Sequence, residues 1–183
     1  MVGSMQAMEA ARGAGVGGTT HISVVDASGC VAALSSSLGS GSGVVVPGTG
    51  IHLNNMLGEA DLAGVEARPG ERLTSMMAPT LVLRGAEPRL VVGSAGSNRL
   101  RGAILQVVRN VVGLGLGVRD AVDAPRVHWE AGQTHAEPGA ECEDADAVRW
   151  RDRNLFFGGA SAVEVCSDGT LAAAGDPRRG GAP

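Results

Sequence analysis

The chain has 183 residues, no lysine among its fifteen basic residues, and a formal net charge of −4. Its length fits one domain with a real core, and a negative charge without a basic patch argues against a non-specific nucleic-acid binder. The longest apolar runs are far too short to cross a bilayer, and no signal peptide is visible, so the sequence leaves the compartment open.

The first half of the chain reads as a leader followed by short strands. Residues 1–18 are rich in glycine, alanine and methionine and are predicted to be a leader or linker remnant, whereas 19–183 form the domain. Polar or Gly/Ser-rich stretches at 38–43 and 57–73 are expected to be loops. Alternating or apolar runs separated by turn residues predict strands at 21–26, 30–36, 44–46, 51–55, 80–84 and 89–93.

The second half contains the predicted helices. The clearest begins at Ser97 or Asn98, either of which can cap it, and carries apolar residues at helical spacing as far as Val111. Further helices are expected at 118–124 and at 144–152, where acids precede arginines in the order that suits the helix dipole. Strands are expected at 126–130, 161–166 and 171–174. This order predicts a layered α/β or α+β domain with a largely antiparallel sheet.

The pair Thr19-Thr20 stands between two glycines and an alternating strand. A threonine hydroxyl is a poor nucleophile unless a base lies within hydrogen-bond reach. A free α-amine with a pKa of about 8 can be that base, whereas the amide nitrogen of an internal threonine cannot. Cleavage of the Gly18–Thr19 bond would therefore activate Thr19. The pair alone is equally consistent with an ordinary strand entry, because β-branched residues favour strands.

Other candidate residues have ordinary explanations when each is taken alone. Glu59 could be a solvated loop acid, and Thr74 and Ser75 could be turn or cap residues. The three cysteines are an odd number without a CxxC motif, and the four histidines lack metal-ligand spacing. Neither a metal nor a cofactor is therefore predicted.

Five separated segments resemble, in the right order, the small subunit of the γ-glutamyltranspeptidases. They are residues 19–26, 47–59, 73–80, 93–99 and 175–179. The resemblance implies an α+β, four-layer αββα N-terminal-nucleophile hydrolase fold, of which this chain would supply the small-subunit part. It also implies a zymogen that is cut autocatalytically before Thr19. The freed threonine would attack a γ-glutamyl amide such as glutathione, and water or an amine would release the glutamyl group from the acyl-enzyme.

The resemblance assigns roles to individual residues. Thr19 would be the nucleophile, and Ser37, or less favourably Ser36, would hydrogen-bond it. The backbone N–H groups of Gly96 and Ser97 would stabilise the oxyanion, helped by the adjoining helix N-terminus. Substrate-binding roles would fall to Glu59 for the α-amine, to Thr74 and Ser75 for the α-carboxylate, and to Asn55 in the paired-asparagine segment.

The sequence also departs from the family pattern. Leu38 and Gly39 stand where the family often has an asparagine beside the substrate, and Ser97 replaces the second oxyanion glycine. Only eighteen residues precede Thr19, whereas in the family a large subunit does so and supplies an arginine for the α-carboxylate. A large-subunit partner chain or segment is therefore expected, because one sheet face would otherwise expose an apolar patch. The alternatives are a related acylase on another amide and an inactive truncated fragment.

Overall fold

The computed structural model of the chain describes residues 18–58, 69–70, 72 and 74–183. The chain divides into two compact units. The first unit consists of the described parts of Met1–Thr20 and Ser36–Ser75, and the second consists of His21–Ser35 and Met76–Pro183. Most of the expected leader lies outside the described residues, so the expected boundary between Gly18 and Thr19 stays a prediction.

A two-stranded sheet opens the described chain and confirms the first predicted hairpin. It consists of β1 (Thr19–Val25) and β2 (Val31–Ser37). Half-buried and exposed residues alternate strictly along both strands. The half-buried face carries polar residues such as His21, whereas the exposed face carries Ile22 and Leu34. This ribbon therefore presents its apolar side outward, the reverse of a sheet that covers its own core.

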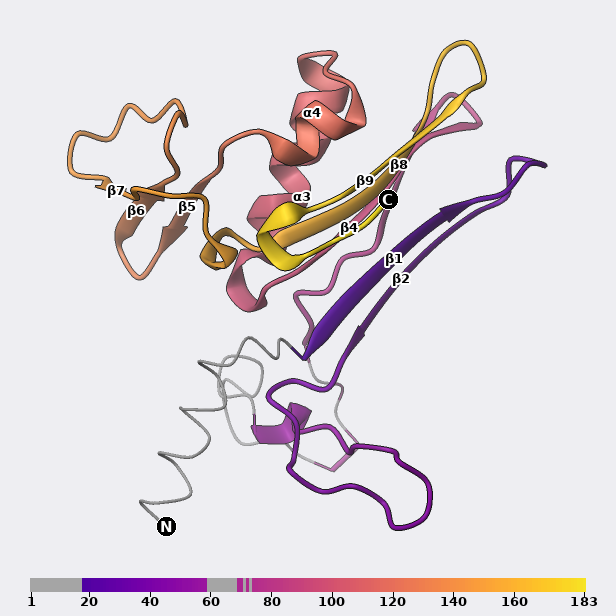
Figure 1. The fold of residues 1–183 in the computed structure, drawn as a ribbon, viewed down its shortest axis with the longest axis vertical. Coiled ribbons are helices and arrows are strands. Elements are labelled where there is room, and N and C mark those ends of the chain that lie inside the picture. Colours follow the sequence, from indigo (N-terminus) through magenta and orange to yellow (C-terminus); the bar gives the residue numbers. More distant parts are fainter. Residues whose placement is uncertain (1–17, 59–68, 71, 73) are drawn as a thin grey trace. The chain divides into compact units, whose positions relative to one another are not determined.

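A four-stranded antiparallel sheet with the strand order β3-β4-β8-β9 forms the centre of the second unit. Its strands are β3 (Thr80–Arg84), β4 (Glu87–Ala95), β8 (Gly159–Val165) and β9 (Leu171–Gly175). Figure 1 shows β4, β8 and β9 running side by side, with two helices against one face of the sheet. The predicted 80–84, 89–93, 161–166 and 171–174 strands are thus confirmed with small shifts of their ends.

Two helices lie where the sequence predicts them, and the first of them buries most of its predicted apolar stripe. They are α3 (Leu100–Val108), which continues as one π-helical turn η3 (Arg109–Gly113), and α4 (Val118–Asp123). Their buried side chains pack on the central sheet in one cluster that consists of Leu90, Val92, Ile104, Val107, Val111, Val118, Ala121, Val122, Ala160, Ala162 and Ala174. Single 3-10 turns complete the helical elements: η1 (Met56–Gly58), η2 (Ser97–Arg99), η4 (Leu155–Phe157) and η5 (Pro177–Arg179).

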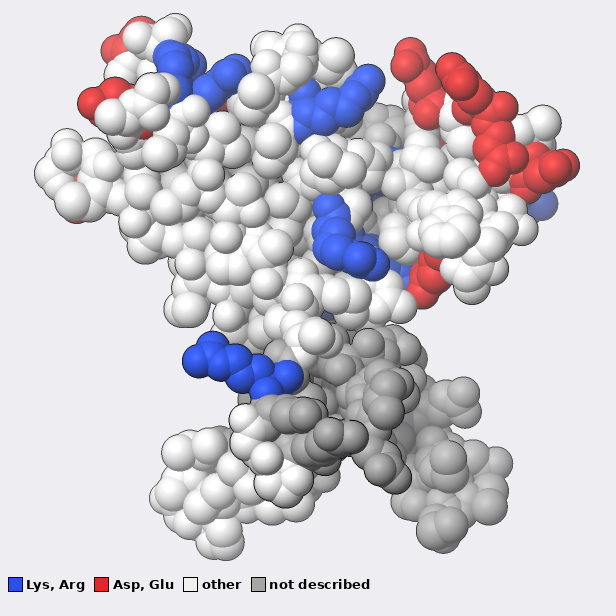
Figure 2. Space-filling view, turned by 180° about the vertical axis from the view of Figure 1, so that it is seen from behind, with Lys and Arg blue, Asp and Glu red and all other residues white. Residues whose placement is uncertain are grey.

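The predicted helix at 144–152 is wrong. This stretch contains instead the short strand β7 (Val148–Arg149), which pairs in parallel with β6 (Gln133–Ala136), itself paired with β5 (Val127–Glu130). Asp144 uses its carboxylate to accept a hydrogen bond from the Asp146 backbone N–H at 3.0 Å. Such a local bond offers the backbone an alternative to a helix. Figure 2 shows acidic side chains gathered at one edge of the face that it presents.

The predicted strand–turn–strand at 44–55 is only partly present. A single isolated bridge joins Val45 to His52, and no regular strand forms on either side of it. Gly43, Gly48 and Gly50 have φ values of 75°, 74° and 71°, which interrupt extended backbone. Across the described part of the chain, no helix is long and apolar enough to cross a bilayer.

Candidate functional site

Thr19 and Ser37 face each other at one end of the β1–β2 ribbon, where the first strand begins and the second ends. Their hydroxyl oxygens lie 2.9 Å apart, within hydrogen-bond distance. Ser37 Oγ also accepts a hydrogen bond from the backbone N–H of Gly39 at 3.0 Å, which fixes the orientation of its hydroxyl. Ser36 is exposed, in keeping with the alternation along the strand. The structure thus brings together Thr19 and the preferred of the two serines.

The peptide bond before Thr19 is held tightly. The carbonyl oxygen of Gly18 accepts a hydrogen bond from the backbone N–H of Leu38 at 2.7 Å. A Cβ atom at Gly18 would lie only 1.7 Å from the carbonyl oxygen of Gly39, so no side chain fits at Gly18 without a shift of that backbone. Glycine before Thr19 is therefore a steric requirement as well as a source of flexibility.

Asn55 is attached to the same end of the ribbon within the first unit. Its backbone N–H donates to the carbonyl oxygen of Leu38 at 2.9 Å, and its Nδ2 donates to Ser40 Oγ at 3.2 Å. Asn54 instead caps the next turn, where its Oδ1 accepts from the Met56 N–H at 3.1 Å. The paired asparagines therefore differ: Asn55 connects to the segment after Ser37, and Asn54 serves a local turn.

The other predicted substrate-binding residues are Glu59, Thr74 and Ser75. Thr74 and Ser75 are exposed and belong to the first unit. Glu59 lies outside the described residues. The predicted oxyanion residues, Gly96 and Ser97, belong to the second unit.

Gly96 and Ser97 form a sharp turn between β4 and the start of the η2–α3 helical segment. Gly96 has φ 141° and Ser97 has φ 54°, both in the region that favours glycine. A Cβ at Gly96 would lie 2.7 Å from Gly158 Cα, so this position accepts only glycine. No side chain caps η2. The turn therefore lies at the N-terminal, positive end of a helical segment, an arrangement that suits a developing negative charge.

A polar chain that the sequence did not reveal lies on the half-buried face of the ribbon. Ser23 donates to the carbonyl oxygen of Ser161 at 3.1 Å, so its oxygen is left to accept from His21 Nε2 at 3.0 Å. His21 Nδ1, 2.7 Å from Ser35 Oγ, then accepts from that hydroxyl. Burial lowers the pKa of His21, which keeps the ring neutral. A Cβ on Gly93 would overlap the imidazole, so this glycine makes room for the ring.

The C-terminal segment that resembles the family is anchored by a buried ionic network. Arg126 Nη2 donates to Asp176 Oδ2 at 2.6 Å, and Arg178 Nε donates to Glu137 Oε1 at 2.8 Å. The side chains of Arg126 and Asp176 are each 2% exposed. Arg126 Nη1 also donates to the carbonyl oxygen of Gly158 at 2.9 Å. This network therefore supports the backbone that lies against Gly96.

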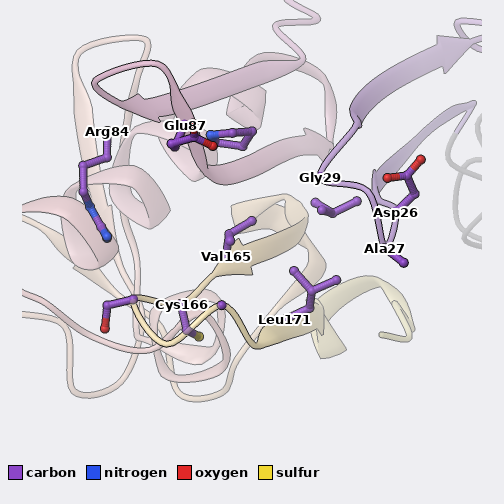
Figure 3. A pocket seen from close by; sticks show the side chains of 12 residues that line it. Asp26, Ala27, Gly29, Arg84, Glu87, Val165, Cys166 and Leu171 are labelled. Atoms are coloured by element: carbon purple, nitrogen blue, oxygen red, sulfur yellow. The ribbon is translucent and has the colours of Figure 1, made fainter.

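A separate hollow of about 430 Å³ lies among three hairpin turns of the second unit. Figure 3 shows Asp26, Arg84, Glu87 and Cys166 among its labelled residues. It contains none of the predicted site residues, and it includes Val25, the end of β1 opposite Thr19. In the described ranges, no group of three or more His, Cys, Asp or Glu residues could hold a metal ion.

Comparison with known proteins decides the family. The gamma-glutamyltranspeptidase family model matches residues 4–183. The chain belongs to the γ-glutamyltranspeptidase family. It is 32% identical over 181 residues to the glutathione hydrolase proenzyme of Escherichia coli (strain K12), with 87% of this chain and 31% of that protein covered. The chain thus spans about a third of the length of this curated relative.

Two further similarities bear on fold and specificity. The structure matches γ-glutamyltranspeptidase from Pseudomonas nitroreducens complexed with L-DON, with a TM-score of 0.72 and 29% identity over 87% of this chain and 95% of that chain. The predicted N-terminal-nucleophile hydrolase fold is thereby confirmed. The chain is also 31% identical over 175 residues to the Acylase ACY 1 proenzyme of Pseudomonas sp. (strain SE83), covering 90% of this chain and 31% of that protein. The chain is thus similar both to a protein named glutathione hydrolase and to one named acylase.

Proposed function

We propose that this chain is the small-subunit part of a γ-glutamyl hydrolase/transferase that acts through an acyl-enzyme on Thr19. The observation that carries the proposal is the hydroxyl pair of Thr19 and Ser37, 2.9 Å apart, beside a peptide carbonyl held by Leu38. Membership of the γ-glutamyltranspeptidase family supports the same reading. A separate large-subunit chain or segment would supply the rest of the fold, because the chain spans 31% of its E. coli relative.

Release of Thr19 would begin at the Gly18 carbonyl. Thr19 Oγ1 attacks the carbonyl carbon, the hydroxyl proton passes to the Thr19 nitrogen as the C–N bond breaks, and an ester forms. Water then hydrolyses this ester and leaves a carboxylate on Gly18 and a free amine on Thr19. The Leu38 N–H, 2.7 Å from the carbonyl oxygen, is placed to stabilise the negative charge that develops on it.

The mature site would then use the new amine as its base. The Thr19 amine accepts the hydroxyl proton as Oγ1 attacks the γ-glutamyl carbonyl, and it returns a proton to the leaving amine. The proposed role of Gly96 and Ser97 is to donate backbone N–H groups to the oxyanion of this step. The substrate roles proposed for Glu59, Asn55, Thr74 and Ser75, like this one, rest on the family resemblance.

Intact-mass measurement and turnover of a γ-glutamyl anilide test the proposal. The chain is incubated alone and with a candidate large-subunit segment, and loss of residues 1–18 is followed together with anilide release. Thr19→Ala is expected to abolish both cleavage and turnover. A persistent full-length chain that stays inactive in the reconstituted complex would contradict the proposal and favour an inactive fragment.

A related acylase is the second candidate function. The ACY 1 relative favours it, and so does the absence of an asparagine side chain at Leu38-Gly39. An acyl anilide without the α-amine and α-carboxylate of glutamate discriminates between the two. Faster turnover of that compound than of the γ-glutamyl anilide would replace the first function by the second.

A further inference from the structure

A carboxylate from another hairpin holds the turn that follows Gly96-Ser97. Glu130, the last residue of β5, accepts a hydrogen bond from Asn98 Nδ2 on Oε1 at 3.1 Å. Its Oε2 pairs with Arg99 Nη2 at 2.8 Å. Asn98 and Arg99 are the residues of η2 that come directly after Ser97. One carboxylate therefore fixes both residues through which the chain leaves the proposed oxyanion pair.

Arg99 is also fixed by an aromatic face and by backbone. Its Cζ lies 4.2 Å from the centroid of the Phe156 ring, which stacks on Trp150 at 4.8 Å. A Cβ on Gly158 would lie 3.4 Å from Arg99 Cβ, and Gly158 Cα is the atom that a Cβ on Gly96 would meet. A displacement of Arg99 is therefore coupled through close backbone contacts to Gly96.

The charges in this cluster match its geometry. Burial raises the pKa of Glu130, but the hydrogen bond from Asn98 and the charge of Arg99 lower it by more, so the carboxylate is ionised at neutral pH. Burial lowers the pKa of His128, whose Nε2 lies 3.5 Å from Glu130 Oε2, and the attraction of Glu130 only partly offsets this. Arg99 is therefore the cation that Glu130 pairs with, through a charge-assisted bond.

We propose that Glu130 is a positioning residue that sets the direction of the Gly96 and Ser97 backbone N–H groups through Asn98 and Arg99. The proposal rests on the function proposed above. No side chain caps η2, so the orientation of this turn depends on contacts made further along it. Oxyanion donors accelerate a reaction only when they are held in place before the charge develops. Loss of Glu130 should therefore reduce turnover without weakening substrate binding.

Kinetics on the assembled enzyme supply the first test. Glu130→Ala is expected to lower kcat about tenfold, because displacement of backbone donors slows the chemical step, while KM changes less than about twofold. Glu130→Gln should recover most of the rate, since its oxygen can accept from Arg99 and Asn98 can turn its amide to meet the new NH₂ group. Asp123→Ala is the matched control: it removes another carboxylate that pairs with an arginine, Arg153, at 2.6 Å. Its kcat should be unchanged.

Amide hydrogen exchange on the full chain supplies a test that needs no activity. Exchange at 97–100 should accelerate at least about threefold in Glu130→Ala and stay unchanged in Asp123→Ala, because only the former loses an anchor of this turn. Unchanged exchange in Glu130→Ala, or unchanged kcat in an active assembly, overturns the positioning role. If the unsubstituted assembly turns over neither anilide, the proposed function fails, and the exchange comparison alone then decides whether Glu130 anchors the turn.

Discussion

At the scale of single residues, the described site is defined largely by backbone, and Gly18 shows this most clearly. Its missing side chain allows close approach to Gly39, and its carbonyl oxygen accepts from Leu38 at 2.7 Å. Gly18→Ala should force the backbone at Gly18 away from Gly39 and Leu38. It should therefore slow release of residues 1–18 by about a hundredfold, since small misplacements of reacting groups have effects of that size. Intact mass over time measures the rate.

The control for this prediction is Gly117→Ala. A Cβ at Gly117 would meet nothing within 4 Å, and the residue has an ordinary φ of −62°. Its cleavage rate should equal that of the unsubstituted chain. Equal rates in both variants would show that contact at Gly18 does not govern cleavage.

Ser97 gives the second prediction at this scale. Its φ of 54° is costly for a residue with a Cβ, by about 1–2 kcal/mol. Ser97→Gly should therefore stabilise the chain by up to about 1 kcal/mol, after allowance for the greater freedom of glycine in the unfolded chain. Urea denaturation measures the change. Ser167→Gly, at a turn serine without a positive φ, should instead destabilise by about 0.5 kcal/mol. The same sign in both variants would contradict the argument.

At the residue scale, the family resemblance pointed to side chains and not to backbone groups. The resemblance named Thr19 and Ser37 as a hydrogen-bonded pair, and the structure places their hydroxyl oxygens 2.9 Å apart, while their catalytic roles stay a prediction. The Leu38 N–H could not be found, since any residue except proline offers a backbone donor. The role of Glu130 was also missed. Its partners Asn98 and Arg99 lie about thirty residues earlier in the chain, and only the fold brings them together.

At the scale of elements, periodic segments could be predicted and non-local pairings could not. The apolar residues of α3 recur at helical spacing because they share the buried face, so this helix was predictable from the spacing alone. Strand β7 has two residues and exists only because β6 lies beside it. A strand of two residues is too short to show an alternating apolar pattern in the sequence. The order of acids and arginines at 144–152 indicated a helix instead.

The buried ionic network that joins the η5 turn to the two ends of the β5–β6 hairpin gives a prediction at the element scale. Arg126→Met should lower the free energy of unfolding by about 3–5 kcal/mol, because Asp176 and the carbonyl oxygens of Gly158 and Val122 would lose a buried donor, although Arg178 would still pair with Asp176. Arg153→Met breaks the exposed pair with Asp123 and should cost less than about 1 kcal/mol. Urea denaturation compares the two variants. Equal losses would mean that burial of the pair does not set its contribution.

At the scale of the whole molecule, acid should weaken the fold in a defined pH window. Burial lowers the pKa of His21 and, against the partial opposition of Glu130, that of His128. The unfolded chain therefore binds more protons than the folded chain below about pH 6.5, so stability is complete above that pH and falls as pH drops through it. Urea denaturation from pH 8 to 5 measures the decline. His21→Asn should make the decline shallower and leave the part due to His128; a stability that is constant or rises toward pH 5 would contradict this account.

The outward face of the β1–β2 ribbon carries exposed apolar side chains. Ile22, Val24 and Leu34 are 52%, 47% and 61% exposed, although they alternate with residues that face the interior. Contiguous exposed apolar side chains mark surfaces that bind another surface. The chain also spans 31% of its E. coli relative, so most of the length of that protein has no counterpart here.

We predict that this apolar face binds the proposed large-subunit chain or segment. Ile22→Thr and Leu34→Thr should each weaken that association at least about tenfold, since burial of one such side chain contributes about 1.5–3 kcal/mol. The same variants should reduce binding of a hydrophobic dye to the chain alone. Leu105→Thr, at a leucine of α3 that is 68% exposed, is the matched control and should leave the association unchanged. Titration of the separately produced segment measures the affinities. Equal weakening by all three substitutions would show that general hydrophobicity, and not this face, governs assembly.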